Sequence, residues 1–205
     1  MTSSSIMIVD YGAGNLRSLQ NALDEVGVSH ELARTPDQIS RANKLLLPGV
    51  GSFVGAMEIL KDRALADPIV SFARSGKPLL GICLGMQLLC TDSTEHGLHE
   101  GLGVIPLRVD RLPTNKGIRV PHVGWNTLVP VDEDPLLADV PEDSDVYFVH
   151  SYAVTPTEDT YLLAVSDHGV RFGAMIRRGY VYGAQFHPEK SQHAGLQILR
   201  NFASL

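Results

Sequence analysis

KPLLGICLGMQ, residues 77–87, is the stretch that decides how the rest of the chain is interpreted. The apolar run 78–82 predicts a buried strand, and the residues after Cys83 have the composition of a helix start. Gly81 and Gly85 stand two residues before and after Cys83, the spacing of the G-x-S-x-G turn, where side chains would collide with neighbouring backbone. This spacing predicts a nucleophilic cysteine that projects above the edge of a sheet.

The predicted turn also defines what surrounds the sulfur of Cys83. Free N–H groups and the dipole at a helix N-terminus favour the thiolate, and the N–H of Leu84 is placed to bind an oxyanion. Gln87 follows one helical turn later, so it shares the helix face of Cys83 and reaches the same pocket. The alternative is a structural cysteine, because free cysteine is among the most buried residue types.

Composition limits the class of protein. The 205 residues suit a single domain over 1–205, and the formal charge of -6 argues against a nucleic-acid or membrane partner. The N-terminal segment has no basic region and only a short apolar run at 6–9, so we expect neither a signal peptide nor a membrane span, and a cytoplasmic protein. We expect Cys83 and Cys90 to be free thiols, because on one helix ~10.5 Å of rise would separate them.

The first half of the chain alternates strand-like and helical patterns. Apolar runs at 6–10, 28–33 and 44–47 precede the strand at 78–82, which predicts a parallel, doubly wound sheet. Thr35, Pro36 and Gln38 predict a capped helix start, and Asp67 is expected to cap the helix before the central strand. The loop 11–15 (YGAGN) resembles a dinucleotide fingerprint, but an arginine replaces its third glycine, so no such site is expected.

A glycine-rich loop, PGVGSF at 48–53, follows the third strand. The carboxyl ends of parallel strands meet at one edge of a sheet, where ligands of open α/β sheets bind. Because glycines let backbone N–H groups approach a ligand closely, we expect Val50 and Gly51 to supply the second oxyanion donor and a donor to the substrate backbone.

Beyond Cys90 the pattern changes to short apolar runs broken by proline and glycine, with a closing helix at 194–202. We expect antiparallel and mixed strands that complete and flank the sheet. The runs are 104–109, 117–120, 128–131, 146–149, 161–165, 174–176 and 181–185.

A cysteine nucleophile needs a base, and the base needs an acceptor that orients it. His187 follows the apolar run 181–186 and precedes a proline, and Glu189 lies two residues later. In extended geometry such residues point the same way. QFHPEKS, 185–191, therefore supplies a candidate base and its orienting carboxylate.

Other polar residues have weaker signals. His96 and His99 lie in a glycine-containing loop without further ligands, so no metal site is expected. Glu95 in that loop is a candidate partner for a ligand ammonium. Trp125, the only tryptophan, is flanked by polar residues, which is compatible with either a half-buried core aromatic or an interface anchor.

Taken together and in this order, PGVGSF, GICLGMQ, HVGWN, FVHSY and QFHPEKS resemble the class I (triad) glutamine amidotransferases. Within these, the chain is similar to the glutaminase subunits of imidazole glycerol phosphate synthases, over essentially its whole length. The resemblance implies a flavodoxin-like α/β fold with a mixed sheet, hydrolysis of L-glutamine to glutamate and ammonia, and no cofactor. The loop 91–99 is less acidic than the family pattern, which weakens the assignment of Glu95.

The resemblance also implies residue roles. Cys83 would be the nucleophile, His187 the acid and base, and Glu189 its partner. Glutamine would be held by Gly51, Gln87, Glu95 and the backbone of Ser151 and Tyr152, with Val50 and Leu84 as oxyanion donors. Ammonia would pass to a cyclase subunit of β/α-barrel type, and the residues matching positions that face it are Asn15, His122, Trp125 and Lys190.

Three other interpretations remain open from the sequence. The chain could be a non-catalytic binding or regulatory subunit, or the glutaminase of another class I amidotransferase. An esterase or peptidase of the α/β-hydrolase type would normally carry its acid before the histidine, whereas Glu189 follows His187.

Overall fold

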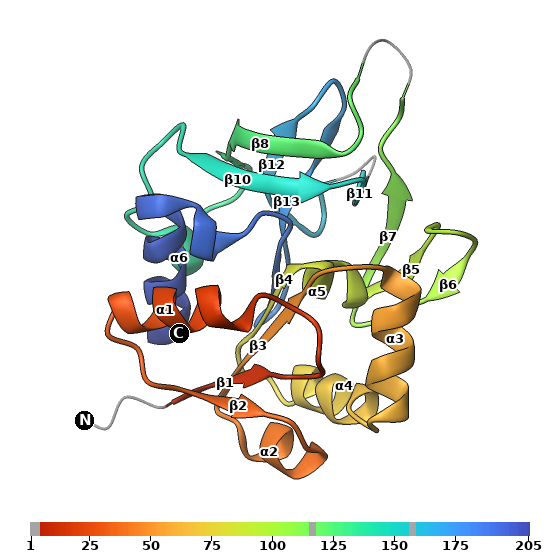
Figure 1. The fold of residues 1–205 in the computed structure, drawn as a ribbon. Coiled ribbons are helices and arrows are strands. Elements are labelled where there is room, and N and C mark those ends of the chain that lie inside the picture. The colour runs from red at the N-terminus through yellow and green to blue at the C-terminus, as the bar shows by residue number, and fades with distance from the viewer. Residues whose placement is uncertain (1–4, 115–117, 156–158) are drawn as a thin grey trace.

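A mixed eight-stranded sheet forms the centre of the molecule (Figure 1). The computed structural model describes residues 5–114, 118–155 and 159–205. The strands, in spatial order, are β2 (His30–Ala33), β1 (Ile6–Val9), β3 (Lys44–Gly49), β4 (Leu79–Cys83), β14 (Val181–Ala184), β13 (Arg171–Arg178), β12 (Leu162–Asp167) and β9 (Val129–Pro130). The first five are parallel to one another, and the pairs β14–β13, β13–β12 and β12–β9 are antiparallel, so a parallel half continues into an antiparallel half.

Helices cover both faces of this sheet, which confirms the predicted doubly wound arrangement. The helices are α1 (Leu16–Glu25), α2 (Pro36–Arg41), α3 (Phe53–Asp62), α4 (Ala66–Arg74), α5 (Leu84–Leu88) and α6 (Gln192–Ser204), with short 3-10 turns η1 (Pro135–Leu137) and η2 (Pro188–Lys190). Buried side chains of α1 and α6 share one apolar cluster, and those of α2, α3 and α4 share another on the opposite face. The polar face of each helix is left to solvent.

Local sequence signals account for most helix starts. The Thr35 side chain accepts the N–H of Gln38 and the Gln38 side chain accepts the N–H of Thr35, which confirms the predicted capping box of α2. The predicted cap at Asp67 is wrong, because α4 begins at Ala66 and its N-cap, Leu65, makes no side-chain cap bond. Asp67 lies instead in the first turn, where a carboxylate still interacts favourably with the helix dipole.

Two small sheets flank the main one. β8 (His122–Thr127) pairs antiparallel with β10 (Asp145–His150), and the second small sheet runs in the order β11 (Tyr152–Ala153), β7 (Ile105–Arg111), β5 (Cys90–Ser93), β6 (His99–Glu100). The predicted helix after Cys83 ends at Leu88, so Cys90 opens a strand; both cysteines are nevertheless free. Of the predicted run 117–120, residue 117 lies outside the described residues, and 118–120 form no strand.

Candidate active site

The bend at Cys83 has the geometry that its flanking glycines require. Cys83 ends β4 with φ 54° and ψ -110°, a backbone conformation that residues other than glycine adopt only when the surrounding structure holds them in it. A Cβ on Gly81 would lie 2.7 Å from the backbone of Gly85, and a Cβ on Gly85 would lie 1.7 Å from the Leu47 oxygen. Both positions therefore exclude a side chain, and the strand turns directly into α5.

The sequence predicts that the Cys83 side chain projects above the sheet edge, but it does not reach bulk solvent, because Cys83 is only 7% exposed. It lies instead in the wall of a cavity of about 560 Å³. The predicted site residues that line this cavity are Val50, Gly51, Cys83, Leu84, Gln87, Glu95, Ser151, Tyr152 and His187. Segments far apart in the sequence thus meet at the carboxyl ends of β3 and β4.

The cavity also contains residues that sequence patterns did not single out. Arg111 ends β7, and Val149 and His150 end β10. Cys83 Sγ approaches the Val149 oxygen at 4.0 Å. Val149 and His150 belong to the FVHSY stretch, but the sequence assigned no role to either of them or to Arg111, because their place at the cavity depends on which strand ends meet there.

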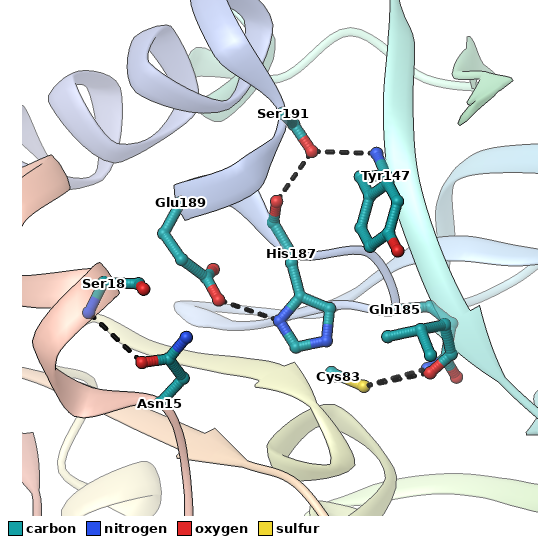
Figure 2. Close-up of polar contacts among 9 residues, drawn as sticks. Asn15, Ser18, Cys83, Tyr147, Gln185, His187, Glu189 and Ser191 are labelled. Atoms are coloured by element: carbon teal, nitrogen blue, oxygen red, sulfur yellow. Dashed lines mark hydrogen bonds and ion pairs between the residues drawn. The ribbon is translucent and has the colours of Figure 1, made fainter. Parts of the chain in front are cut away.

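His187 and Glu189 form a buried pair behind the sulfur (Figure 2). His187 Nδ1 lies 2.8 Å from Glu189 Oε1, and the two side chains are 3% and 4% exposed. The predicted pairing is correct, but its predicted geometry is wrong, because Pro188 starts the 3-10 turn η2 and the segment is not extended. Ser191 Oγ donates to the His187 oxygen at 2.7 Å and fixes the turn.

The other ring nitrogen of His187 faces the Cys83 sulfur. Figure 2 shows the ring directed toward Cys83, and Nε2 has no hydrogen-bond partner among the described residues. Burial alone would lower the pKa of His187, but the Cys83 sulfur and the Glu189 carboxylate outweigh it and raise the pKa to about 9. The ring is therefore protonated at neutral pH.

A buried amide pair continues this network on the other side of the sulfur. Gln87 Nε2 donates to the Tyr152 oxygen at 2.9 Å and to Gln185 Oε1 at 3.0 Å. Gln185 Nε2 in turn lies 3.9 Å from Cys83 Sγ. Because both Nε2 hydrogens of Gln87 go to the protein, its Oε1 remains as the acceptor for a ligand in the cavity. Gln185, fully buried, is a site residue that sequence reasoning missed.

Glu95 lies at the cavity as predicted, with one oxygen already engaged. Its Oε2 accepts the N–H of Phe53, the first residue of α3, at 2.7 Å. This bond ties the loop before β6 to the glycine-rich loop after β3 and satisfies a free donor at a helix N-terminus. Only Oε2 of this carboxylate is used in that bond, and the residue lines the cavity.

The residues expected to face a partner divide into surface and interior. Trp125 is 47% exposed, its ring lies 5.8 Å from that of Tyr147, and Lys190 Nζ lies 5.6 Å from the same Tyr147 ring. Asn15 is exposed and caps α1 by accepting the N–H of Ser18. The half-exposed Trp125 is thus not a core aromatic.

His122 is a correction to the predicted set. It is 4% exposed and stacks on Phe148 with ring centroids 4.9 Å apart. On β8 it alternates with Val123 and Trp125, so its side chain points to the inner face of the β8–β10 pair. It therefore cannot itself contact a partner at that surface.

The described residues contain no group of three or more His, Cys, Asp or Glu side chains arranged to hold a metal ion. None of their helices is both long enough and apolar enough to cross a membrane.

Comparison with known proteins gives consistent results. The family described as "Glutamine amidotransferase class-I" matches residues 7–204. A protein of Desulfitobacterium hafniense named "Imidazole glycerol phosphate synthase subunit HisH" is 47% identical over 197 residues, covering 96% of this chain and 92% of that protein. One of the same name from Geobacter sulfurreducens is 44% identical, covering 98% and 99%.

A relative of different length is the Arabidopsis thaliana protein named "Imidazole glycerol phosphate synthase hisHF, chloroplastic". It is 45% identical over 98% of this chain, which spans 34% of that protein. Among solved structures, "Crystal structure of glutamine amidotransferase" has a TM-score of 0.75 at 18% identity, covering 97% and 99%. "Structure of PurLQS from Thermotoga maritima" has the same TM-score and identity, covering 98% of both chains. These two structures establish the fold alone.

Proposed function

Because this chain belongs to the class I glutamine amidotransferase family, we propose that it is the glutaminase subunit of an imidazole glycerol phosphate synthase. It hydrolyses L-glutamine to glutamate and ammonia for histidine biosynthesis. The observation that carries the proposal is the arrangement of Cys83 and His187 on one cavity, with Glu189 2.8 Å behind the imidazole. This is the nucleophile, base and orienting acid that acyl transfer requires.

The first step forms a thioester. The Cys83 thiolate attacks the carbon of the glutamine side-chain amide, and the amide oxygen becomes a tetrahedral oxyanion. The N–H groups of Val50 and Leu84 stabilise this charge, and each such donor contributes about 3 kcal/mol. Protonated His187 then gives its proton to the nitrogen that leaves as ammonia.

The second step releases glutamate. Neutral His187 takes a proton from water, whose oxygen attacks the thioester carbon and restores the thiolate as the leaving group. Glu189 holds Nδ1 throughout, so that Nε2 exchanges the proton at the reacting side. The same ring thus serves as acid and base in turn.

The cavity is suited to an amino-acid substrate. Its volume of about 560 Å³ lies within the range of small-molecule sites. Gln87 Oε1 and the free oxygen of Glu95 are acceptors for the substrate's N–H groups, while the backbone of Gly51, Ser151 and Tyr152 holds the remainder. No cofactor takes part in this chemistry.

The fused plant relative supports a partner for the released ammonia. This chain corresponds to about a third of a longer synthase in that relative. We assign the corresponding partner here to a separate cyclase subunit of β/α-barrel type, forming a heterodimer in the cytoplasm. The cluster of exposed Trp125 and Lys190 around the partly buried Tyr147, together with Asn15, is the surface proposed to face it.

The deciding experiment removes the sulfur and follows glutamate formation in the presence of the cyclase subunit. Cys83→Ala is expected to reduce turnover by at least about 10⁴-fold, because no nucleophile replaces the thiolate. A chloroketone analogue of glutamine should alkylate the wild-type chain at Cys83.

Cys90→Ala is the matched control, since Cys90 is the other buried thiol and does not line the cavity. It should keep wild-type turnover. Turnover retained in Cys83→Ala would reject the proposed mechanism, and a wild-type chain inactive with every cyclase supplied would support the non-catalytic alternative.

A further inference from the structure

Three histidines outside the proposed catalytic residues gather at one end of β8 and β10. His122 pairs directly with His150 across the two strands, so both side chains share the inner face. His168, just after β12, stacks on His122 with ring centroids 4.0 Å apart. His150 also lines the cavity, which connects this cluster to the proposed glutamine site.

The hydrogen bonds of His122 and His150 all run the same way, with each ring donating from Nδ1 and accepting at Nε2. A carbonyl only accepts, so His150 Nδ1, 3.0 Å from the Tyr152 oxygen, carries a hydrogen. In a neutral ring His150 Nε2 is then a bare acceptor, and His122 Nδ1, 3.0 Å away, donates to it. His122 Nε2 is left as an acceptor for the next group in the chain.

Asn126 supplies the last donor. Its Nδ2 lies 3.4 Å from His122 Nε2 and also donates to the Asp167 oxygen at 2.8 Å. Its Oδ1 accepts the N–H of Thr127 at 2.9 Å, so the orientation of the amide is determined at both ends. The chain therefore runs from Asn126 through two imidazoles to the Tyr152 carbonyl.

This arrangement requires uncharged rings. Burial, followed by the nearby histidines, lowers the pKa of His150 to about 3 and that of His122 to about 4. A proton added to His150 would place two N–H groups face to face at the 3.0 Å contact, and one added to His122 would set its Nε2–H against the Asn126 amide N–H at 3.4 Å. Both rings are consequently neutral at pH 7.

The pocket end of the chain has a second donor. The Tyr152 oxygen also accepts from Gln87 Nε2, whose other hydrogen goes to Gln185. The position of this carbonyl thus determines where Gln87 presents its free oxygen. A shift of the Tyr152 peptide would move both the substrate-binding backbone and the Gln87 amide.

We propose that His122 and His150 are positioning residues for the glutamine pocket: their one-way hydrogen-bond chain holds the Tyr152 carbonyl and, through it, Gln87. The inference rests on the proposed function, because it takes this cavity as the glutamine site. Neither ring takes part in the reaction. If the rings merely filled the core, any aromatic side chain of the same size would serve as well.

The direct test needs no variant. Nitrogen-15 NMR of the imidazole rings in the wild-type chain at pH 7 should find His122 and His150 both protonated at Nδ1. His168 should be protonated at Nε2, since that atom lies 2.8 Å from the Arg119 oxygen. A hydrogen on Nε2 of His150 would overturn the inference, whether or not the chain hydrolyses glutamine.

The functional test compares equal substitutions in the same stack. His122→Phe keeps an aromatic ring and removes the donor to His150, so KM for glutamine should rise roughly five- to tenfold with kcat within about twofold. The His150 spectrum should change with it. His168→Phe, the matched control, removes only the bond to the Arg119 oxygen and should leave KM unchanged. Equal KM values in the two variants would contradict the proposal.

A conservative replacement provides rescue. His150→Asn places an amide donor where Nδ1 stood, so KM should lie closer to wild type than in His150→Leu, which offers none. If His150→Asn and His150→Leu raise KM equally, the Tyr152 bond is not what positions the pocket. If all variants and the wild type lack turnover while the ring protonation is as stated, the proposed function fails and the hydrogen-bond chain stands.

Discussion

Two histidines line the same cavity in opposite states. Burial lowers the pKa of both, yet His187 is raised to about 9 and His150 is lowered to about 3. The difference comes from the groups that contact each ring. His187 has the Glu189 carboxylate and the Cys83 sulfur, whereas His150 has the Tyr152 carbonyl and another imidazole. Burial lowers the pKa of a histidine by itself, as at His150, and charged partners reverse that shift at His187.

The two states suit two tasks. A ring that is protonated beside a sulfur can give and take a proton during acyl transfer. A ring that stays neutral through the physiological range keeps one donor and one acceptor, so it can hold a fixed hydrogen-bond chain. One cavity can therefore contain a proton carrier and a structural donor made from the same residue type.

The largest effect is expected from removing the charge that distinguishes His187. Glu189→Gln keeps the shape but not the carboxylate, so the pKa of His187 should fall and its tautomer is no longer specified. Turnover should drop about 10³- to 10⁴-fold, measured as glutamate formation with the cyclase subunit. The control Glu100→Gln changes an exposed carboxylate on β6. A loss of less than tenfold in Glu189→Gln would show that the sulfur alone sets the state of His187.

The free energy of unfolding should depend on pH with opposite signs for the neutral histidines, His122 and His150, and for the protonated His187. His122 and His150 have folded pKa values below the unfolded value near 6.5, so their contribution is lost as pH falls from about 6.5 toward 4 and 3. His187 has a raised folded pKa, so its contribution is complete below about 6.5 and is lost as pH rises through 9. Each proton contributes a slope of about 1.4 kcal/mol per pH unit.

Urea denaturation from pH 4.5 to 10 would measure these slopes. In a plot of the free energy of unfolding against pH, His122→Phe should reduce the slope on the acid side by the equivalent of up to one proton and leave the alkaline side unchanged. Glu189→Gln should instead reduce the slope on the alkaline side. The slopes, rather than the absolute free energies of unfolding, carry the information, because each substitution also alters packing. Identical acid limbs in wild type and His122→Phe would mean that His122 is not held neutral.

The smallest effect on the isolated chain is expected on the outer face of β8. Trp125 is half-exposed, so Trp125→Ala should change the free energy of unfolding by less than about 1 kcal/mol and leave the His122 and His150 spectra unchanged. Affinity for the cyclase subunit should fall about tenfold, as for an aromatic interface anchor. Tyr180→Ala, an exposed aromatic between β13 and β14, is the control. Equal losses in both variants would place the interface elsewhere.

Much of the site could be predicted because its signals are local. A side chain on Gly81 would collide with the backbone of Gly85, so the glycine spacing around Cys83 predicts the bend, whereas the contact that excludes a side chain at Gly85 comes from Leu47 on β3. Pro188 starts a 3-10 turn through its own restricted backbone, and that turn brings His187 and Glu189 together. Such signals depend on backbone sterics, which the neighbouring residues determine.

The β8–β10 pair was less predictable for a physical reason. On β8 the apolar Val123 and Trp125 are exposed while the polar His122 is buried, which inverts the usual pattern. The inversion is stable because His150, on another strand, satisfies the buried ring. No pattern within β8 contains that information.

The alternation of strands and helices, the bend at Cys83 and the pairing of His187 with Glu189 can be predicted from residue patterns alone, because sterics and spacing over a few residues account for most of each. The position of the sulfur in a cavity wall, the presence of Gln185 and His150 at the site and the inward direction of His122 depend on the three-dimensional arrangement of the chain. Those features arise where strand ends from distant parts of the chain meet, and the charge or hydrogen bond that each group finds there depends on neighbours that are remote in sequence.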